Sequence, residues 1–155
     1  MGGFADLKQL AWEVYGYDGG KKVKGRKRHI VVDSQGLLIG LLVSEAQTSE
    51  RLGAAVVLVE AADELSKVEV VWVDSGYSGD NFARVVAQIC SARVEVIERI
   101  SQAFEVLPKR WIVERTFGWL NRFRRLSKDY EQHTESSEAM IYGSLIRLMT
   151  RRLAA

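Results

Sequence analysis

The sequence predicts an α/β fold, with a mixed sheet flanked by helices. Apolar runs typical of strands alternate along the chain with apolar residues at the three- and four-residue spacing of helices. At 155 residues, with 47% hydrophobic and 27% charged residues, the chain fits one soluble domain with a core of its own. It contains no run of eighteen apolar residues, so we expect no membrane span.

The first predicted elements form an antiparallel hairpin. The apolar runs His29–Val32 and Leu37–Val43 are joined by the short loop Asp-Ser-Gln-Gly at 33–36. The remaining predicted elements are, in order, a helix over 50–65, a buried strand Val68–Val73, a helix around Phe82–Ile89, a short strand Val94–Ile97, a helix over 109–126 after the single proline, and a last helix over Ser136–Arg152.

Asp74 directly follows the apolar run VVWV, residues 70–73, and precedes the turn signal SGYSG. Apolar residues on both faces predict a strand that is buried on both sides. Asp74 then lies at the carboxyl end of the strand, where open α/β sheets keep their sites. The alternative for an isolated Asp at this position is a solubilising residue or a helix cap.

The predicted helix after Pro108 carries a single acid on a basic face. Its buried stripe contains Ile112, Thr116, Trp119, Phe123 and Leu126. At about 100° per residue, Glu114 points roughly opposite Ile112, and within about 40° of it lie Arg110, Gly118, Asn121 and Arg125. Salt bridges between residues four apart would account for Glu114, but not for the surplus of arginines around it.

Basic residues are concentrated in two blocks although the net charge is only +2. Residues 21–28 read KKVKGRKR, with six basic residues in eight, and Lys109 to Lys128 hold seven basic residues and one acid. Two such blocks favour a face that binds a polyanion, whereas either one alone could be a solvated surface. The single Cys90 excludes an internal disulfide, and the N-terminus lacks the pattern of a secretory signal, so we expect a cytoplasmic protein.

Three segments carry a resemblance to a known family: GYDGGKKVKGRKRHIVVDSQGLL, VDSGYSG and LPKRWIVERTFGWLNRFRRLSKDYE. Together they resemble the C-terminal part of bacterial insertion-sequence transposases of the DDE type, in the IS-four/IS-five superfamily. The resemblance covers roughly residues 16–153. It implies an RNase H-like fold, DNA cleavage and strand transfer, and three carboxylates that hold two divalent metal ions, usually magnesium and otherwise manganese.

The resemblance also assigns residues. Asp74 matches the second catalytic aspartate, Glu114 the catalytic glutamate, and Arg110 the arginine four residues before it. Leu107 and Asn121 stand where many relatives of the wider group carry Tyr and Lys. The expected partner is DNA, both element ends and target, with a second copy or a full-length transposase as a further partner. The expected DNA-binding residues are Lys21, Lys22, Lys24, Arg26, Lys27, Arg28, Arg110, Arg115, Arg122, Arg124 and Arg125.

The main departure from the family concerns the first aspartate, which lies on the first strand of such enzymes. Residues 1–15 do not resemble that motif, so we expect an atypical segment there and a partial catalytic domain over 16–155, with weakened metal binding. Asp33, at the end of the second strand, and Asp6, in a foreign context, are weak candidates for the missing ligand.

The missing motif also affects the sheet. Without the central first strand, the hairpin and the Asp74 strand would each expose an unpaired edge. Residues 10–15 could supply a substitute strand, although a helix is equally plausible.

The sequence is therefore compatible with two functions. The first is a truncated and inactive transposase catalytic domain. The second is a non-catalytic DNA-binding or inhibitory remnant that acts with a full-length transposase.

Overall fold

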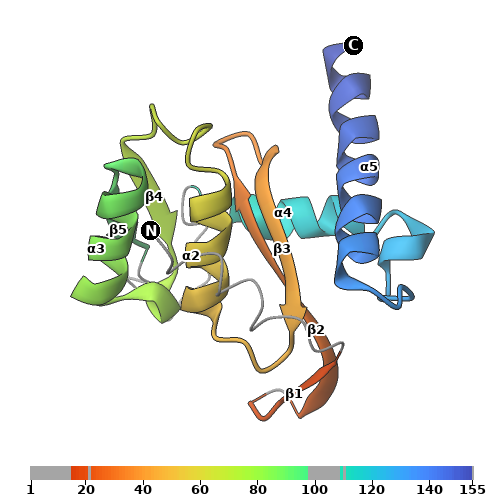
Figure 1. The fold of residues 1–155 in the computed structure, drawn as a ribbon. Coiled ribbons are helices and arrows are strands. Elements are labelled where there is room, and N and C mark those ends of the chain that lie inside the picture. Colours follow the sequence, from red (N-terminus) through yellow and green to blue (C-terminus); the bar gives the residue numbers. More distant parts are fainter. Residues whose placement is uncertain (1–14, 21, 98–108, 110, 155) are drawn as a thin grey trace, which may run out of the picture.

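The computed structural model describes residues 15–154, apart from residues 21, 98–108 and 110. Its elements follow the predicted order of hairpin, helix, strand, helix, strand and helices (Figure 1). They are β1 (Gly16–Asp18), β2 (Val23–Val32), β3 (Leu38–Glu45), α2 (Glu50–Glu60), β4 (Val70–Val73), the short 3-10 helix η1 (Ser75–Tyr77), α3 (Asp80–Cys90), β5 (Arg93–Val96), α4 (Trp111–Leu120), the short 3-10 helix η2 (Arg124–Leu126) and α5 (Thr134–Leu153).

The described strands form two sheets, which together with the helices confirm an α/β fold. β1, β2 and β3 make an antiparallel sheet, and β4 and β5 make a parallel pair. The predicted hairpin is present, although β2 begins six residues before His29, at Val23. The sheet breaks its register between Val31 and Val32, next to the turn.

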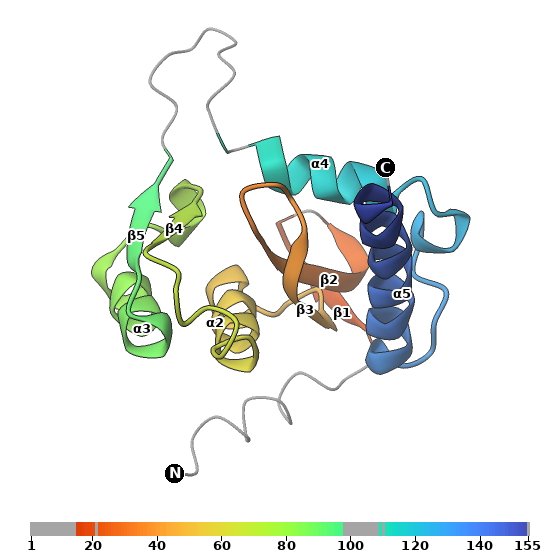
Figure 2. The same ribbon diagram turned by 90° about the horizontal axis from the view of Figure 1, so that it is seen from above.

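The hairpin β2–β3 is covered on both faces, because successive side chains of a strand point to opposite sides. Leu42 packs with Val56 and Val57 of α2 on one face. Leu41 and Val43 pack on the other with residues of α4, η2 and α5. Helix α2 also contacts α3, so it lies between the hairpin and the β4–β5 pair (Figure 2).

Two sequence predictions need correction. The strand expected over Val68–Val73 is shorter and is not buried on both sides, since Trp72 is 37% exposed and the other residues of β4 are half-buried. The reason is that β4 pairs with a single described neighbour, and its cover comes from the α2–α3 side. The helix expected to run to Leu126 ends at Leu120, and a separate 3-10 turn follows.

Among the described strands, none pairs with both β2 and β4, so the two sheets share no hydrogen-bonded ladder. The expectation from the sequence that a central strand is missing between them stays a prediction, because residues 1–14 lie outside the described residues. The candidate substitute at residues 10–15 lies outside the described residues, except for Tyr15. The free side of β3 is partly capped, because the backbone N–H of Val43 donates to Glu138 Oε1 of α5 at 2.8 Å.

Candidate functional site

Asp74 is exposed and lies immediately after β4, at the carboxyl end of the parallel pair. Its Oδ1 accepts a hydrogen bond from the backbone N–H of Gly76 at 2.9 Å, which caps the 3-10 helix η1. Asp74 therefore acts as a helix cap, which is the alternative role considered for it from the sequence. A carboxylate has several further lone pairs, so the cap leaves Asp74 able to bind a second group.

A second carboxylate lies near Asp74 and was not expected from the sequence. Glu50 is the first residue of α2, and a Cβ added to Gly76 would be 3.0 Å from Asp74 Oδ1 and 3.7 Å from Glu50 Oε2. Burial, followed by the negative charges of Glu50 and then Asp74, raises the pKa of Tyr77 to about 12. Tyr77 is therefore a neutral phenol beside two acids.

Arg51 fixes the loop that follows Asp74. Its Nε donates to the carbonyl of Gly76 at 3.0 Å, and its Nη2 donates to the carbonyl of Ser78 at 2.9 Å. The only sequence signal at this position is Ser49, whose hydroxyl caps α2 and marks where the helix begins. Nothing in that signal indicates that the first turn of α2 lies against the loop after β4.

Glu114 is exposed on α4, opposite the buried Ile112 and Thr116, as the helical spacing predicts. The basic stripe expected around it is shorter than predicted. Asn121 and Arg125 do not share its helix face, because α4 ends before them.

The segment that leads into α4 contacts β4. The Nζ of Lys109 lies 3.4 Å from the centroid of the Trp72 ring. Trp72 also donates from Nε1 to Glu95 at 2.8 Å, and this bond is the largest of the effects that lower the pKa of Glu95. Trp72 and Asp74 are two residues apart, and Glu114 is five residues beyond Lys109. The cation–π contact thus links the two segments that carry the predicted catalytic acids.

The middle of α4 is anchored to the turn between β2 and β3 (Figure 2). Thr116 Oγ1 donates to the carbonyl of Gly36 at 2.8 Å, and Arg115 donates to the carbonyl of Gln35 at 2.6 Å. Gly36 has φ of 79°, and a Cβ there would be only 2.9 Å from Thr116 Oγ1, so the close approach requires glycine.

Arg115, a predicted DNA-binding residue, is committed to contacts along α4. Its guanidinium lies 4.3 Å from the Trp111 ring and 4.9 Å from the Trp119 ring, one helical turn before and after it. Arg152 of α5 covers Trp119 at 4.1 Å. These cation–π contacts give Arg115 a structural role that the sequence pattern did not indicate.

Arg26, in the first basic block, points inward. Its side chain is only 1% exposed and forms an ion pair with Asp129 at 3.3 Å. It also donates to the carbonyls of Glu131, at 3.0 Å, and Gln132, and lies 4.7 Å from the centroid of the Tyr15 ring. In this conformation Arg26 holds the segment after η2 against β2 and does not face solvent.

The neighbours of Arg26 are also engaged. Lys27 Nζ donates to the carbonyl of Thr48 at 2.9 Å, and Arg28 donates to the carbonyl of Leu126 at 3.0 Å. Burial lowers the pKa of Arg28, partly offset by the charge of Asp129. The exposed members of this block are Lys22 and Lys24, while Lys21 lies outside the described residues.

The second basic block is more open. Arg122 and Arg124 are exposed, in the turn and the 3-10 helix that follow α4. Arg125 is exposed too and pairs with Glu131 at 3.0 Å. Arg110, the residue that resembles the family's arginine, lies outside the described residues.

Asp33, a weak candidate for the first catalytic acid, is used by the hairpin turn. Its Oδ1 accepts from the backbone N–H groups of Gln35 and Leu37, each at 2.8 Å. Asp6 lies outside the described residues. Within the part of the chain that the structure describes, no group of three or more His, Cys, Asp or Glu residues is arranged to hold a metal ion.

A family model for the transposase DDE domain matches residues 4–149. The chain belongs to the DDE transposase family. The chain is also 26% identical, over 132 residues, to a putative transposase for the insertion sequence element IS402 from Burkholderia cepacia. The alignment covers 80% of this chain and 60% of that relative, so the chain spans less than two thirds of its length. No solved structure matches the chain.

These matches confirm the resemblance to insertion-sequence DDE transposases. They do not test the assignment to the IS-four/IS-five superfamily, which stays a prediction. Among the helices of the described residues, none combines the length and the apolar composition of a membrane span.

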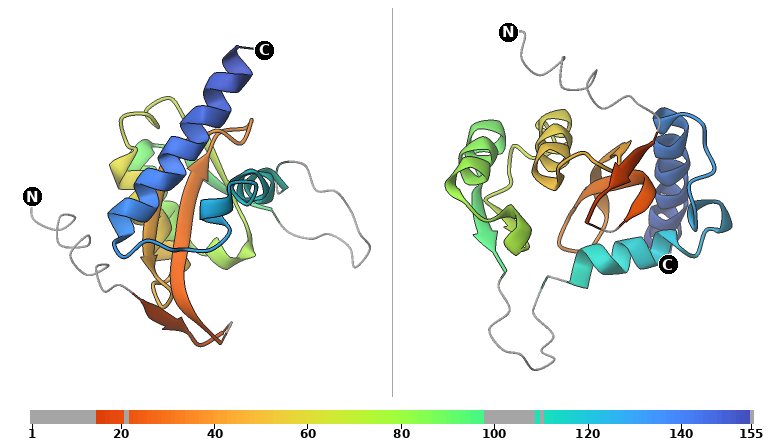
Figure 3. Two further views of the ribbon diagram at one scale, coloured as in Figure 1. Left: turned by 90° about the vertical axis from the view of Figure 1, so that its right-hand side faces the viewer. Right: turned by 90° about the horizontal axis from the view of Figure 1, so that it is seen from below.

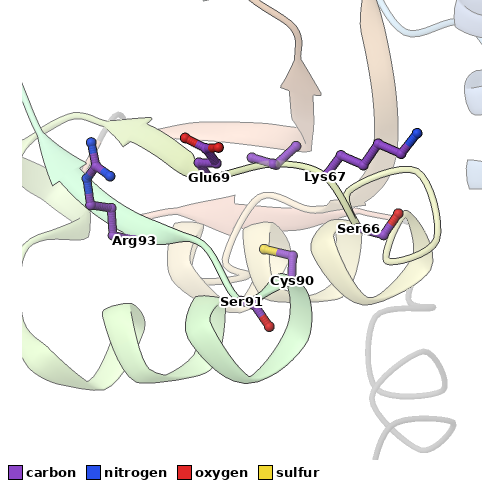
Figure 4. A pocket seen from close by; sticks show the side chains of 7 residues that line it. Ser66, Lys67, Glu69, Cys90, Ser91 and Arg93 are labelled. Carbon is purple, nitrogen blue, oxygen red and sulfur yellow. The ribbon is translucent and has the colours of Figure 1, made fainter.

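The β4–β5 pair also carries a hollow at its other end (Figure 4). Its lining residues are Ser66, Lys67, Val68, Glu69, Cys90, Ser91 and Arg93. They precede β4 and β5 or begin them, whereas Asp74 follows β4. Cys90 is buried, and its thiol lies 3.3 Å from the carbonyl of Val86. This hollow is therefore separate from the carboxyl ends of the strands, where open α/β sheets bind their ligands.

Proposed function

We propose that this chain is part of an insertion-sequence transposase whose DNA cleavage and strand transfer depend on Asp74 and Glu114. The observation that carries the proposal is the placement of Asp74, exposed at the carboxyl end of a parallel strand in a chain of the DDE family. Glu114 is exposed on a helix whose leading segment contacts β4 through Lys109 and Trp72.

The two acids fit a divalent metal in their chemistry. Magnesium prefers oxygen ligands, and carboxylates supply them, so Asp74 and Glu114 would hold magnesium or manganese. When bound, a pair of such ions activates a water or a 3′-hydroxyl and stabilises the leaving oxygen of a phosphodiester. The residues themselves fix the donor positions: the bond from Gly76 N–H orients Asp74, and the anchoring of α4 on the hairpin turn fixes the helix that carries Glu114.

The fold proposed for the complete enzyme is RNase H-like. The described strands form an antiparallel hairpin and a separate parallel pair, and helix α2 contacts both the hairpin and α3. This arrangement is compatible with an RNase H-like sheet when one further strand lies between β2 and β4. The same strand would bring the first catalytic aspartate. We propose that residues 15–154 supply two of the three catalytic carboxylates, and that the chain alone neither cuts nor joins DNA.

DNA is the proposed substrate and partner. The described cations best placed to meet phosphates are the exposed ones, Lys22, Lys24, Arg122 and Arg124. Lysine and arginine contacts to phosphates release counterions, so affinity falls steeply with salt and depends little on sequence.

The second candidate is a non-catalytic DNA-binding or inhibitory remnant that acts with a full-length transposase. The exposed Arg122 and Arg124 favour it, because phosphate attraction depends on charge and survives the loss of a metal ligand.

The test combines metal binding with strand cleavage. The chain is titrated with manganese while backbone amide signals are recorded by NMR, and broadening should appear around both Asp74 and Glu114. Asp74→Asn and Glu114→Gln should each reduce it, whereas Asp80→Asn, an exposed acid in the first turn of α3, should not. Broadening at neither acid would refute the proposed site.

Cleavage then separates the two functions. We expect the chain to bind supercoiled or element-end DNA without cutting it in magnesium or manganese. Metal-dependent cleavage that Asp74→Asn abolishes would show a competent enzyme and overturn the proposal of inactivity. It would also require a first carboxylate from another part of the chain or from a second subunit.

A further inference from the structure

The two acids proposed to hold metal lie on parts of the molecule that share no strand ladder. Asp74 follows β4, whereas Glu114 is on α4, which is anchored to the hairpin turn at Gly36. Within the described residues, β4 pairs with β5 alone. Helix α2 lies between the hairpin and the β4–β5 pair in the views from above and from below (Figures 2 and 3). Contacts made by α2 therefore help to set where Asp74 lies relative to the hairpin.

The start of α2 is held by the hairpin. Lys27 of β2 donates from Nζ to the carbonyl of Thr48 at 2.9 Å, directly before the cap residue Ser49. One turn into the helix, Gly53 packs on the buried His29 so closely that an added Cβ would overlap its ring. The first turn of α2 thus has a fixed place on the hairpin.

Arg51 joins this turn to the loop that follows Asp74. Its Nε donates to the carbonyl of Gly76 at 3.0 Å, and its Nη2 donates to the carbonyl of Ser78 at 2.9 Å. The backbone N–H of the same Gly76 donates to Asp74 Oδ1 at 2.9 Å. The residue that orients the carboxylate is therefore itself held by Arg51. A guanidinium presents its donors in a planar, rigid fork, so two bonds to the loop fix its direction as well as its distance.

We propose that Arg51 is a positioning residue for metal binding by Asp74. Its fork fixes the loop over residues 75–78 to the first turn of α2, and this sets the direction of the Asp74 carboxylate relative to the hairpin. The inference rests on the proposed function, in which Asp74 and Glu114 hold the metal. Residues that orient a ligand from behind typically change metal affinity by about ten- to hundredfold.

The charge and the geometry of Arg51 predict opposite effects on metal binding. A positive charge near a carboxylate repels a divalent cation, so removal of the charge by itself should strengthen binding. Loss of the fork leaves Gly76 free to move, and a carboxylate without a fixed direction binds the metal more weakly. The sign of the change in affinity therefore distinguishes positioning from electrostatics.

The first test is a manganese titration of the full chain, followed through its backbone amide signals by NMR. In Arg51→Met, the manganese concentration that half-broadens the signals around Asp74 should rise about tenfold or more. Arg51→Lys keeps the charge but has no fork, so it should show the same loss. Arg84→Met is the matched control, because this arginine of α3 bonds to Asn81 and Asp80 of its own helix. It should not raise the concentration.

The second test needs no metal. The amides of Tyr77 and Ser78 donate to carbonyls within the loop at 3.1 and 3.2 Å. Their hydrogen exchange should become faster in Arg51→Met, because the loop opens more often without the fork. The amide of Ile97, which donates to the carbonyl of Val73 in β4 at 2.8 Å, should exchange at the same rate in both proteins. Circular dichroism verifies that the variant keeps its fold.

The outcomes separate this inference from the proposed function. No broadening around Asp74 in the wild-type chain would overturn both. Broadening in the wild-type chain with equal or tighter binding in Arg51→Met would overturn the inference alone. Full binding by Arg51→Lys, or loop amides that exchange at the wild-type rate in Arg51→Met, would also overturn it, because the fork would then be dispensable.

Discussion

The two basic blocks of the chain look alike in sequence and differ in structure. In the first, Arg26 has a 1%-exposed side chain and Arg28 is bonded to a backbone carbonyl. In the second, Arg122 and Arg124 are exposed. The same residue type therefore supports the fold at Arg26 and Arg28 and is exposed to solvent at Arg122 and Arg124. Local density of positive charge is a poor guide to a binding surface unless the depth of each side chain is known.

The difference follows from where each block lies. The first block is on β2, between α2 on one face and α4, η2 and α5 on the other, so the cations have carbonyls and Asp129 within reach. Arg122 and Arg124 of the second block lie in the turn and the 3-10 helix after α4, where their side chains meet water. A buried guanidinium must be paired to be stable, whereas an exposed one needs no partner.

The largest effect expected is the loss of stability when the buried cation is removed. Arg26→Ala leaves Asp129 without its ion-pair partner and frees the carbonyls of Glu131 and Gln132, so the free energy of unfolding should fall by about 3–4 kcal/mol. Urea unfolding measures it. Arg124→Ala, in the exposed block, should change stability by less than about 0.5 kcal/mol. Equal losses for both variants would remove the distinction between the blocks.

The neighbouring His29 should make stability depend on pH. Burial, and next the charge of Lys27, lower its pKa from 6.5 to about 4, so between these values the unfolded chain binds a proton that the folded chain does not. The free energy of unfolding should therefore fall as the pH drops from 6.5 toward 4, by about 3 kcal/mol from this group. His29→Gln, measured by urea unfolding from pH 8 to 4, should have a shallower dependence. Parallel curves for the two proteins would contradict the assignment.

Two glycines, one beside the buried His29 ring and one in open space on α4, give a third comparison between buried and exposed positions. A Cβ on Gly53 of α2 would overlap the His29 ring, so Gly53→Ala should destabilise the protein by about 2 kcal/mol. Gly118→Ala on α4 meets no atom within 4 Å and should stabilise by about 0.5–1 kcal/mol. Thermal unfolding midpoints should move in opposite directions, and a gain in both would show that His29 is free to move aside.

The smallest effect concerns the exposed block and appears in DNA binding. Replacing Arg122 and Arg124 with Ala should reduce the slope of log affinity against log salt by about 1.8, since each phosphate contact contributes about 0.9. Fluorescence anisotropy with duplex DNA between low and physiological salt measures this. Arg93→Ala, an exposed arginine paired with Glu95, is the matched control. An unchanged slope in the double variant would mark these arginines as solvated surface.

The order and type of the described elements were predictable, because they follow from local periodicity. The hairpin turn, the strand before Asp74, the amphipathic α3 and the long α5 each have a sequence signal within a few residues of where they lie. The exposure of Asp74 and Glu114 was predictable for the same reason. The early end of α4 was not predictable, because the stripe of apolar residues continues past Leu120. The backbone turns there, and this turn brings Leu126 into the core under α5.

The sequence by itself determined the α/β class, the strand-end position of Asp74, the outward direction of Glu114 and the membership of the transposase family. Only the tertiary structure decided that Arg26, Lys27 and Arg28 bond to distant carbonyls and acids, that Glu50 joins Asp74 beside Tyr77, and that Arg51 bonds to the loop after Asp74. The physical reason is the range of the interactions. Periodicity and caps depend on residues a few positions apart, whereas the partner of a buried charge, such as Asp129 for Arg26, is 103 residues away and is set by packing.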